Sequence, residues 1–225
     1  MIKKLIFSAV LLTSSFANAG IIYSGTIIND SGFHGSYASS HVNDQSGLSD
    51  TYVSGTTDYD TYASLNPTHI GSSSTSGISG TGALDLGVQA AFIDFDFGME
   101  LMFTDFGLWN DVDTQGIKNF NVLVSNDVNF STFTTLGLFT ATIGFADPIP
   151  LQQFDLLDTT GRYVRVDMLS THGSTDINFG EFIFGASSAN AVPEPSTLAI
   201  FALGLMGFAS RRFKKQSKEL KIDLF

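Results

Sequence analysis

The stretch Ile93-Asp94-Phe95-Asp96-Phe97 alternates between apolar and acidic side chains with a period of two. Successive side chains of a β-strand point to opposite faces, so the three apolar residues share one face and the two aspartates share the other. This stretch therefore predicts a strand with one face in a hydrophobic core and the other face toward solvent.

Three further stretches have a similar character, and together they predict an all-β domain. The apolar residues that we expect to face the core are Phe120, Val122 and Val124, then Val164, Val166 and Met168, then Phe182, Ile183 and Phe184. Glycines and clusters of Asn, Asp or Ser separate the stretches at short intervals, and no amphipathic helix is predicted before residue 192. This pattern is typical of an antiparallel sandwich or jelly roll. The low-complexity segment 71–82 is predicted to be a mobile loop.

The N-terminus is predicted to be a secretory signal peptide, residues 1–19. Lys3 and Lys4 precede an apolar run from Leu5 to Leu12, and Ala17-Asn18-Ala19 supplies the small residues that a signal peptidase requires. We expect cleavage after Ala19, so the chain crosses the inner membrane. Because the chain has no cysteine, the exported part must be stabilised by its core or by a metal ion.

The predicted domain, residues 20–191, is strongly acidic. Its only cations are Lys118, Arg162 and Arg165, and it holds 19 of the 22 acidic residues, so its net charge is −16 against −11 for the whole chain. Such a surface argues against nucleic acid or anionic lipid as a partner. Carboxylates are ligands that divalent cations prefer, although solubility alone accounts for most of these charges.

The C-terminal segment, residues 192–215, has three parts in a fixed order. They are Val192-Pro193-Glu194-Pro195-Ser196, an apolar run from Thr197 to Ala209, and the basic residues Arg211, Arg212, Lys214 and Lys215. The two prolines hold the first part extended. The apolar run is shorter than the roughly 20 residues of a comfortable membrane span, and the cations after it are expected to stay in the cytoplasm.

This order resembles the PEP-CTERM sorting signal of Gram-negative bacteria. In that family an exosortase, a membrane cysteine protease, is thought to recognise the motif and remove the tail. The resemblance implies transient insertion of the helix in the inner membrane, followed by release to the cell surface. The alternative is an ordinary C-terminal anchor helix. Residues 216–225 continue beyond the basic cluster, where the family usually ends, and are predicted to be a cytoplasmic tail.

A second resemblance covers the later half of the domain. Segments 118–127 (Lys-Asn-Phe-Asn-Val-Leu-Val-Ser-Asn-Asp), 161–170 (Gly-Arg-Tyr-Val-Arg-Val-Asp-Met-Leu-Ser) and 179–185 (Phe-Gly-Glu-Phe-Ile-Phe-Gly) resemble three strands of discoidin-like domains, in the family's order. The resemblance implies a galactose-binding-like jelly roll for residues 20–191, a fold that is common among carbohydrate-binding modules.

Many domains of that fold hold a structural calcium ion, and the resemblance implies where it would bind. The matching residues are Asp44, Ser46 and Ser49 in an early loop and Glu181 in the closing strand. Carboxylates, hydroxyls and turn carbonyls form the oxygen-rich shell that Ca²⁺ prefers. The alternative is that Asp44 only forms an Asx-turn and that Glu181 forms a salt bridge with Arg162 or Arg165.

Other candidate sites carry weaker signals. Asp111-Val112-Asp113-Thr114-Gln115-Gly116 partly resembles an EF-hand loop but lacks its closing glutamate, and a solvated loop is the favoured interpretation. Trp109, with Tyr59 or Tyr62, is a candidate glycan contact, although a lone tryptophan at a strand end more often belongs to the core. The four histidines are scattered, and no nucleophile–base motif is present, so we expect no enzymatic activity.

The sequence thus predicts an exported, surface-sorted protein of the cell envelope or extracellular polymer matrix. Its leading role is structural or adhesive. The alternative is a carbohydrate-binding module that recognises a surface or matrix glycan.

Overall fold

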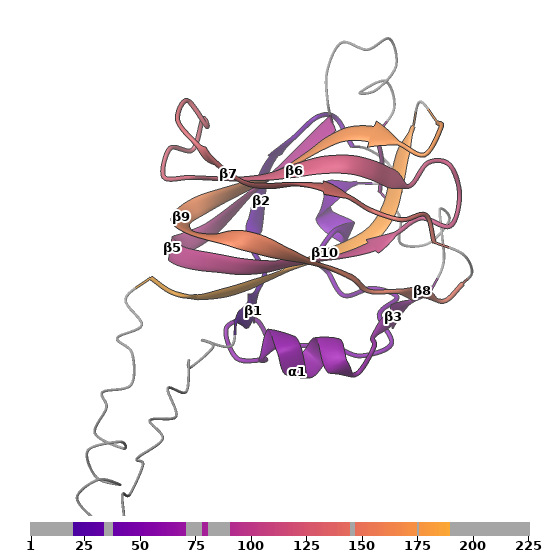
Figure 1. Cartoon of the computed structure of the whole chain (residues 1–225), viewed down its shortest axis with the longest axis horizontal. Helices are drawn as coiled ribbons and strands as arrows, with labels where there is room; N and C mark the ends of the chain where they lie inside the picture. The colour runs from indigo at the N-terminus through magenta and orange to yellow at the C-terminus, as the bar shows by residue number, and fades with distance from the viewer. Residues whose placement is uncertain are drawn as a thin grey trace, which may run out of the picture. The chain divides into compact units, whose positions relative to one another are not determined.

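The computed structural model describes residues 20–33, 38–70, 78–80, 91–144, 147–174 and 176–189 (Figure 1). All described residues belong to one compact unit that ends at Ala189, and the second unit, Asn190–Phe225, lies outside them. The predicted signal peptide, sorting segment and C-terminal tail therefore lie outside the described residues. Within the described part, no helix is long and apolar enough to cross a membrane.

The fold is all-β and antiparallel, as the sequence predicts. Its strands are β1 (Ile21–Tyr23), β2 (Thr26–Asp30), β3 (Thr68–His69), β4 (Ile78–Gly80), β5 (Ala91–Asn110), β6 (Ile117–Ser125), β7 (Thr134–Thr140), β8 (Ile149–Pro150), β9 (Gln152–Thr171) and β10 (Ile177–Ser188). Eight strands form one sheet in the order β1-β10-β5-β9-β6-β7, with β2 on β5 and β4 on β10. The strands β3 and β8 form a separate two-stranded sheet.

The two 20-residue strands, β5 and β9, turn this sheet into a sandwich (Figure 1). The first half of β5 pairs with β2 and with the second half of β9, which continues to β6 and β7. The second half of β5 pairs with β10 and with the first half of β9. The register between β5 and β9 shifts between Asp96 and Leu101, next to Gly98, whose φ of 74° favours glycine. Each long strand therefore contributes to both layers.

Phenylalanine rings fill the space between the layers. Phe95 in the first layer contacts Phe182 and Phe184 in the second, and Phe106 contacts Phe120 in the same way. The residues that the sequence assigns to the inner faces of Phe120–Val124 and Val164–Met168 are buried, as predicted. Aromatic pairs of this kind stabilise a core beyond the area they bury.

A second apolar cluster covers the outer side of β5 and β10. It contains Ile22, Tyr52, Tyr59, Tyr62, Ala63, Trp109, Ile149 and Ile183. Its tyrosines and Ala63 come from the segment around α1 (Tyr59–Ser64), a short helix that the sequence analysis does not predict. Asp58 begins this helix, because its side chain accepts a hydrogen bond from the Thr61 amide at 2.7 Å.

The prediction of a loop over residues 71–82 is wrong for three of them. Ile78–Gly80 form β4 and pair with Ile177–Phe179 of β10. The remaining residues of that segment lie outside the described ones. The strand was missed because its composition, rich in Ser and Gly, has no alternation to predict it.

Candidate functional site

Glu181 on β10 is a carboxyl group without solvent exposure. Neither of its oxygens accepts a well-formed hydrogen bond from the described residues. Burial, and next the negative charge of Asp44, raise the pKa of Glu181 to about 9. An ionised carboxylate in this position needs a counter-charge or a proton.

The loop that follows the short 3₁₀ helix Ser39–His41 lies against Glu181. The Phe182 amide donates a hydrogen bond to the Val42 carbonyl at 2.8 Å, which ties the loop to β10. Gln45 has a φ of 63°, and its side-chain oxygen accepts a hydrogen bond from the Tyr52 amide at 2.8 Å. These contacts hold the loop so that Asp44 is the acidic group that acts most strongly on Glu181.

Asp44 itself is partly exposed and already has partners. Its Oδ1 accepts a hydrogen bond from the Ser46 amide at 2.7 Å, which is the Asx-turn expected as an alternative. Its Oδ2 lies 2.8 Å from Nδ1 of His41. Asp44 therefore forms the Asx-turn and at the same time lies near enough to Glu181 to raise its pKa.

The other expected ligands are placed differently. The Ser49 hydroxyl donates to Asp50 Oδ2 at 2.8 Å and accepts a hydrogen bond from the Thr68 amide at 2.9 Å, so it is already engaged. Ser46 contributes its amide to the Asx-turn. The described residues contain no group of three or more His, Cys, Asp or Glu side chains that could hold a metal ion. A cation between Asp44 and Glu181 would therefore need carbonyl or water oxygens as further ligands.

The alternative salt bridge of Glu181 is wrong, because both arginines pair with β5. Arg165 donates to Asp94 through Nε and a terminal nitrogen at 2.6 and 2.8 Å, and Arg162 contacts Asp96 in the same way at 2.7 and 2.8 Å. The antiparallel register places Arg165 directly opposite Asp94, although the sequence analysis did not pair these residues.

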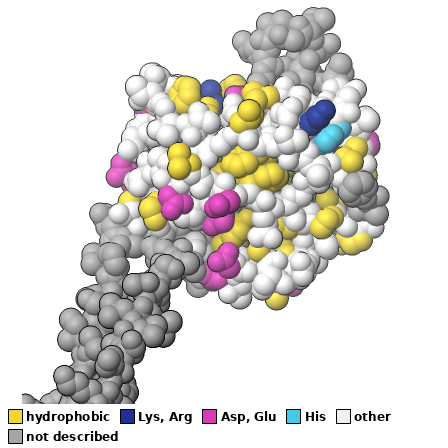
Figure 2. Space-filling model, in the orientation of Figure 1, with side chains coloured by type: hydrophobic (Ala, Val, Ile, Leu, Met, Phe, Trp, Pro, Cys, Tyr) yellow, Lys and Arg dark blue, Asp and Glu magenta, His cyan; other side chains and the backbone are white. Residues whose placement is uncertain are grey.

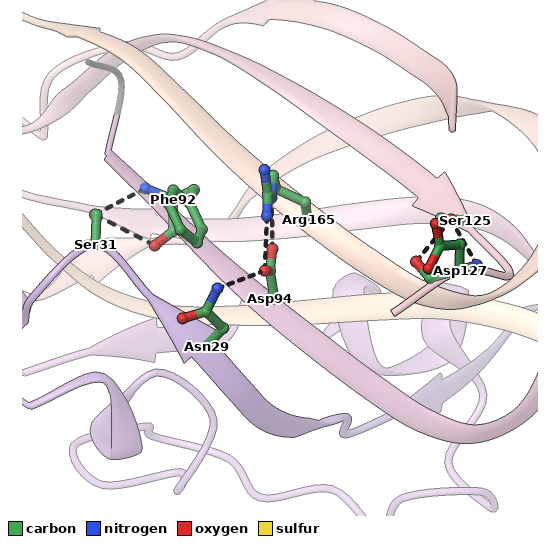
Figure 3. A network of polar contacts seen from close by, with 7 residues as sticks. All are labelled: Asn29, Ser31, Phe92, Asp94, Ser125, Asp127 and Arg165. Carbon is green, nitrogen blue, oxygen red and sulfur yellow. Dashed lines mark hydrogen bonds and ion pairs between the residues drawn. The ribbon is translucent and has the colours of Figure 1, made fainter. Parts of the chain in front are cut away.

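Figure 3 shows the environment of the Arg165–Asp94 pair. Asn29 of β2 donates a further hydrogen bond to Asp94 at 3.3 Å. The guanidinium lies over the ring of Phe92 at 4.2 Å and over that of Phe130 at 4.6 Å. Asp127 stabilises the turn that carries Phe130, because its carboxylate accepts hydrogen bonds from the Asn129 and Ser131 amides. The arginine is thus paired with Asp94, and Asp127 is held by backbone amides, so these contacts support a structural role.

The candidate glycan contacts are buried, which corrects that prediction. Trp109, Tyr59 and Tyr62 are exposed by 0%, 1% and 2%, and Trp109 donates a hydrogen bond to the Pro67 carbonyl at 3.0 Å. The two tyrosines of α1 pack in one apolar cluster with Trp109, so none of the three rings has a face available to a sugar. The core interpretation of Trp109 is confirmed.

The segment 111–116 is not fully solvated either. Asp111 is buried, and burial raises the pKa of its carboxyl group. Its Oδ1 accepts a hydrogen bond from the Val112 amide at 2.6 Å, and Asp113 accepts one from the Gln115 amide at 2.7 Å. The two carboxylates thus stabilise a turn.

The described surface has an open depression of about 280 Å³ beside the β6–β7 connection. The residues that line it include three threonines and one aromatic residue, Thr132, Phe133, Thr134 and Thr160, together with Asn126, whose side chain is hydrogen-bonded to Glu100 and to the Arg162 amide. Phe133 is 55% exposed. Sequence reasoning missed this aromatic residue, because it lies in a connection and not at a predicted strand end.

Comparisons with known proteins identify the C-terminal segment. The family model of the PEP-CTERM protein-sorting motif matches residues 191–215, which confirms the resemblance. A comparison with curated protein sequences finds no match.

Several solved structures are similar to the domain, and they are carbohydrate-binding modules. The CBM32 of AlyQ in complex with 4,5-unsaturated mannuronic acid is 16% identical with a TM-score of 0.47, over 73% of this chain and 97% of that one. Chitosan-binding module 1 from a Paenibacillus sp. IK-5 chitosanase/glucanase is 16% identical with a TM-score of 0.45, over 72% and 95%. The family 32 module of C. perfringens NanJ in complex with galactose is 7% identical with a TM-score of 0.45, over 71% and 91%. This chain spans only 38% of a truncated AlyQ that also has an alginate lyase domain.

Proposed function

We propose that this protein is exported and then sorted to the cell surface by an exosortase that processes its C-terminal segment. There it acts as a structural or adhesive component of the envelope or of the extracellular polymer matrix, without catalytic activity. The observation that carries the proposal is the match of the sorting motif to residues 191–215. The predicted signal peptide supports it, because a sorting segment acts only on an exported chain.

The surface of the domain suits this role. The face in Figure 2 carries acidic side chains and few cations, in keeping with the net charge of −16 between residues 20 and 191. Two of the three cations in that range, Arg162 and Arg165, are paired with aspartates. Such a surface keeps the domain soluble and gives it an affinity for divalent cations.

We also propose that a calcium ion binds between Asp44 and Glu181 and stabilises the folded domain. The support is the buried Glu181 carboxyl group, whose oxygens lack a well-formed hydrogen bond while a second carboxylate acts on it. A cation would offset both charges. It would also tie the early loop to the last strand of the sheet.

A second candidate function is the binding of a matrix glycan in the depression beside Phe133. The observation that favours it is a half-exposed aromatic residue in a depression that three threonines also line. Sugars commonly bind where an aromatic face lies beside a few polar groups. This candidate replaces the buried Trp109 as the aromatic platform.

Mass analysis of the mature protein together with its cell fraction tests the leading function. We expect a chain that begins at Gly20, ends within or before residues 191–215 and is found at the cell surface or in the medium. A mature chain that still carries Arg211 to Phe225 in the native host would contradict the proposed sorting.

A glycan array separates the second candidate from the first. Saturable binding that Phe133→Ala weakens and Leu138→Ala leaves unchanged would favour a carbohydrate-binding module. Leu138 is a matched control, because it is 68% exposed on β7 and lies outside the depression. If the array shows no saturable binding, the second candidate is wrong.

A further inference from the structure

Asp105 on β5 is a half-buried carboxylate surrounded by other acids. It accepts a hydrogen bond from the Thr104 hydroxyl at 2.7 Å. Burial raises the pKa of Asp105, and the negative charges of Asp60, Asp155 and Asp158 raise it further. Among the described residues no cation acts on this group. The two arginines of the domain do not neutralise Asp105, because they pair with Asp94 and Asp96.

Two glycines make room for this carboxylate. A Cβ atom at Gly20 would lie 2.9 Å from the Thr104 hydroxyl and 3.3 Å from Asp105 Oδ2. A Cβ atom at Gly185 would lie 2.9 Å from the same carboxylate oxygen. The Asp105 side chain is therefore closely flanked by Gly20 and Gly185, and a larger residue at either position would displace it.

Gly20 is fixed in this place and is buried. Its carbonyl accepts a hydrogen bond from the Tyr59 amide at 2.7 Å, and the next residue, Ile21, pairs with Ala186. With standard bond lengths, the Gly20 nitrogen lies within about 6 Å of Asp105 Oδ2. A rotation about the bonds of this terminal residue would suffice to bring the nitrogen to the carboxylate.

Tyr59 is a second polar residue whose ring lies beside Asp105. Its hydroxyl is buried and has no hydrogen-bond partner among the described residues. The ring lies beside Asp105, since a Cβ atom at Gly185 would meet both. Burial raises the pKa of Tyr59, and Asp105 and Asp60 are the charged groups that raise it further. A buried hydroxyl without a partner is costly, so a donor that came within reach of the Tyr59 hydroxyl would stabilise the folded state.

We propose that this cluster is a binding site for the chain's own amino terminus, in which the α-ammonium group of mature Gly20 pairs with Asp105. The inference rests on the proposed export. Signal peptidase hydrolyses the Ala19–Gly20 bond: water adds, the C–N bond breaks, Ala19 leaves as a carboxylate and Gly20 becomes an ammonium. Cleavage thus places a positive charge beside four acidic residues where the precursor has only a neutral amide.

The pair has a defined dependence on pH. A free α-amino group has a pKa of about 7.7–8.0. Pairing raises this pKa in the folded state, so the stabilisation is present at pH values below about 8 at which Asp105 is ionised, and it is lost as the pH rises through the raised value. The titratable groups that interact with Asp105 are Asp60 and Tyr59 on α1 and Asp155 and Asp158 on β9.

The test uses the full chain expressed with its own leader and purified after leader removal, with the first residue established by mass spectrometry. The rate at which an acylating reagent modifies the Gly20 amine is measured against pH. We expect a pKa about one unit or more above that of Asp105→Asn, and about tenfold slower acylation near neutral pH. Glu100→Gln is the matched control, since it removes an exposed charge elsewhere and should change neither value.

A second comparison separates the ion pair from a general effect of charge. Insertion of two glutamines between Ala19 and Gly20, with cleavage after Ala19 verified by mass spectrometry, gives a mature chain whose amine is displaced from the site. We expect this extension to lower the melting temperature of the natural chain and to have no effect in Asp105→Asn. Equal amine pKa values in the natural chain and Asp105→Asn would overturn the proposal. So would an extension effect that survives Asp105→Asn.

The outcomes also distinguish this inference from the proposed function. If the mature chain begins at a residue other than Gly20, the proposed ion pair is wrong, whereas the proposed sorting by the C-terminal segment is not affected. A mature chain that begins at Gly20 with an unshifted amine overturns only the ion pair.

Discussion

Glu181 is the residue on which the stability of the domain depends most clearly. It is fully buried and faces a second carboxylate, so in the folded protein it must be protonated or compensated by a cation. We expect pH and calcium to decide which of the two occurs. Both dependences can be measured.

We expect calcium to raise the melting temperature of the protein and chelation to lower it. An ion that binds only the folded state stabilises it by about 2.7 kcal/mol when its concentration is about 100-fold above Kd. Glu181→Gln and Asp44→Asn should abolish this response, as followed by thermal unfolding in calcium and in chelator. Magnesium at matched ionic strength is the control. Equal stabilisation by magnesium, or a full calcium response in both variants, would show that the site is wrong.

Without calcium, stability should fall as the pH rises from about 5 to 9. The folded-state pKa of Glu181 is about 9, whereas an unfolded glutamate titrates near 4.3, so the folded state binds more protons throughout this range. The slope contributed by this one group approaches about 1.4 kcal/mol per pH unit. Urea unfolding at several pH values should show a shallower decline in Glu181→Gln. An identical decline in that variant would assign the effect to other carboxyl groups, such as Asp111 or Asp167, whose pKa values burial also raises.

At the scale of elements, the pairing of β5 with β9 contains two arginine–aspartate pairs with the same geometry and different burial. Asp94 is 1% exposed and Arg165 24%, whereas Asp96 is 21% exposed and Arg162 42%. Loss of one partner of a buried pair leaves an uncompensated charge, and an exposed pair contributes little. The two pairs therefore form an internal comparison.

Arg165→Met should destabilise the domain by about 3–5 kcal/mol, because Asp94 remains buried without its counter-charge and the rings of Phe92 and Phe130 lose the cation between them. Arg162→Met should cost about 0.2–1 kcal/mol. Urea unfolding of both variants measures the difference. Similar losses in the two variants would mean that burial does not decide the strength of these pairs.

Much of this architecture was predictable from local alternation. The faces of Phe120–Val124 and Val164–Met168 follow from a period of two, and the structure buries the predicted sides. In Ile93–Phe97 the structure buries Ile93 and Phe95 as predicted. It also buries Asp94, which the alternation placed toward solvent, because Arg165 pairs with it. The passage of β5 between layers at Gly98 was not predictable, because it depends on the register with β9, which no local pattern encodes.

The candidate site was also predictable in part. The resemblance predicted Asp44 and Glu181, which the structure brings close enough for one to shift the pKa of the other. It also included Ser49, whose hydroxyl is engaged by Asp50 and Thr68, contacts between segments that alternation does not predict. Trp109 was considered a candidate contact because the sequence analysis did not predict α1. In the structure, residues of the segment around α1 pack against Trp109 and bury it.

At the scale of the whole molecule, we expect the sorting segment to determine the cellular location of the domain. The apolar run before Arg211 is short for a permanent anchor, and the sorting motif precedes it. We therefore expect the tail to be a transient signal and not a lasting membrane attachment.

In a host without an exosortase, the uncut chain should remain in the inner-membrane fraction. Truncation after Ala191 should release the domain into the periplasm of the same host. Cell fractionation with immunoblotting distinguishes the two chains. Release of the full-length chain without cleavage would contradict the role of the tail as a retained membrane segment.

The pairing of β1 with β10 has a consequence for the order of events during export. Ile21–Tyr23 pair with Phe184–Ala186, so the first strand of the domain meets its partner only after almost the entire domain has been translocated. Contacts this distant in sequence form slowly, which favours closure of the sheet after the last strand has emerged. Because β10 ends at Ser188, closure would coincide with the arrival of residues 191–215 at the membrane. Chains arrested before residue 177 should therefore remain sensitive to protease on the exported side, whereas chains extended through the sorting segment should acquire resistance.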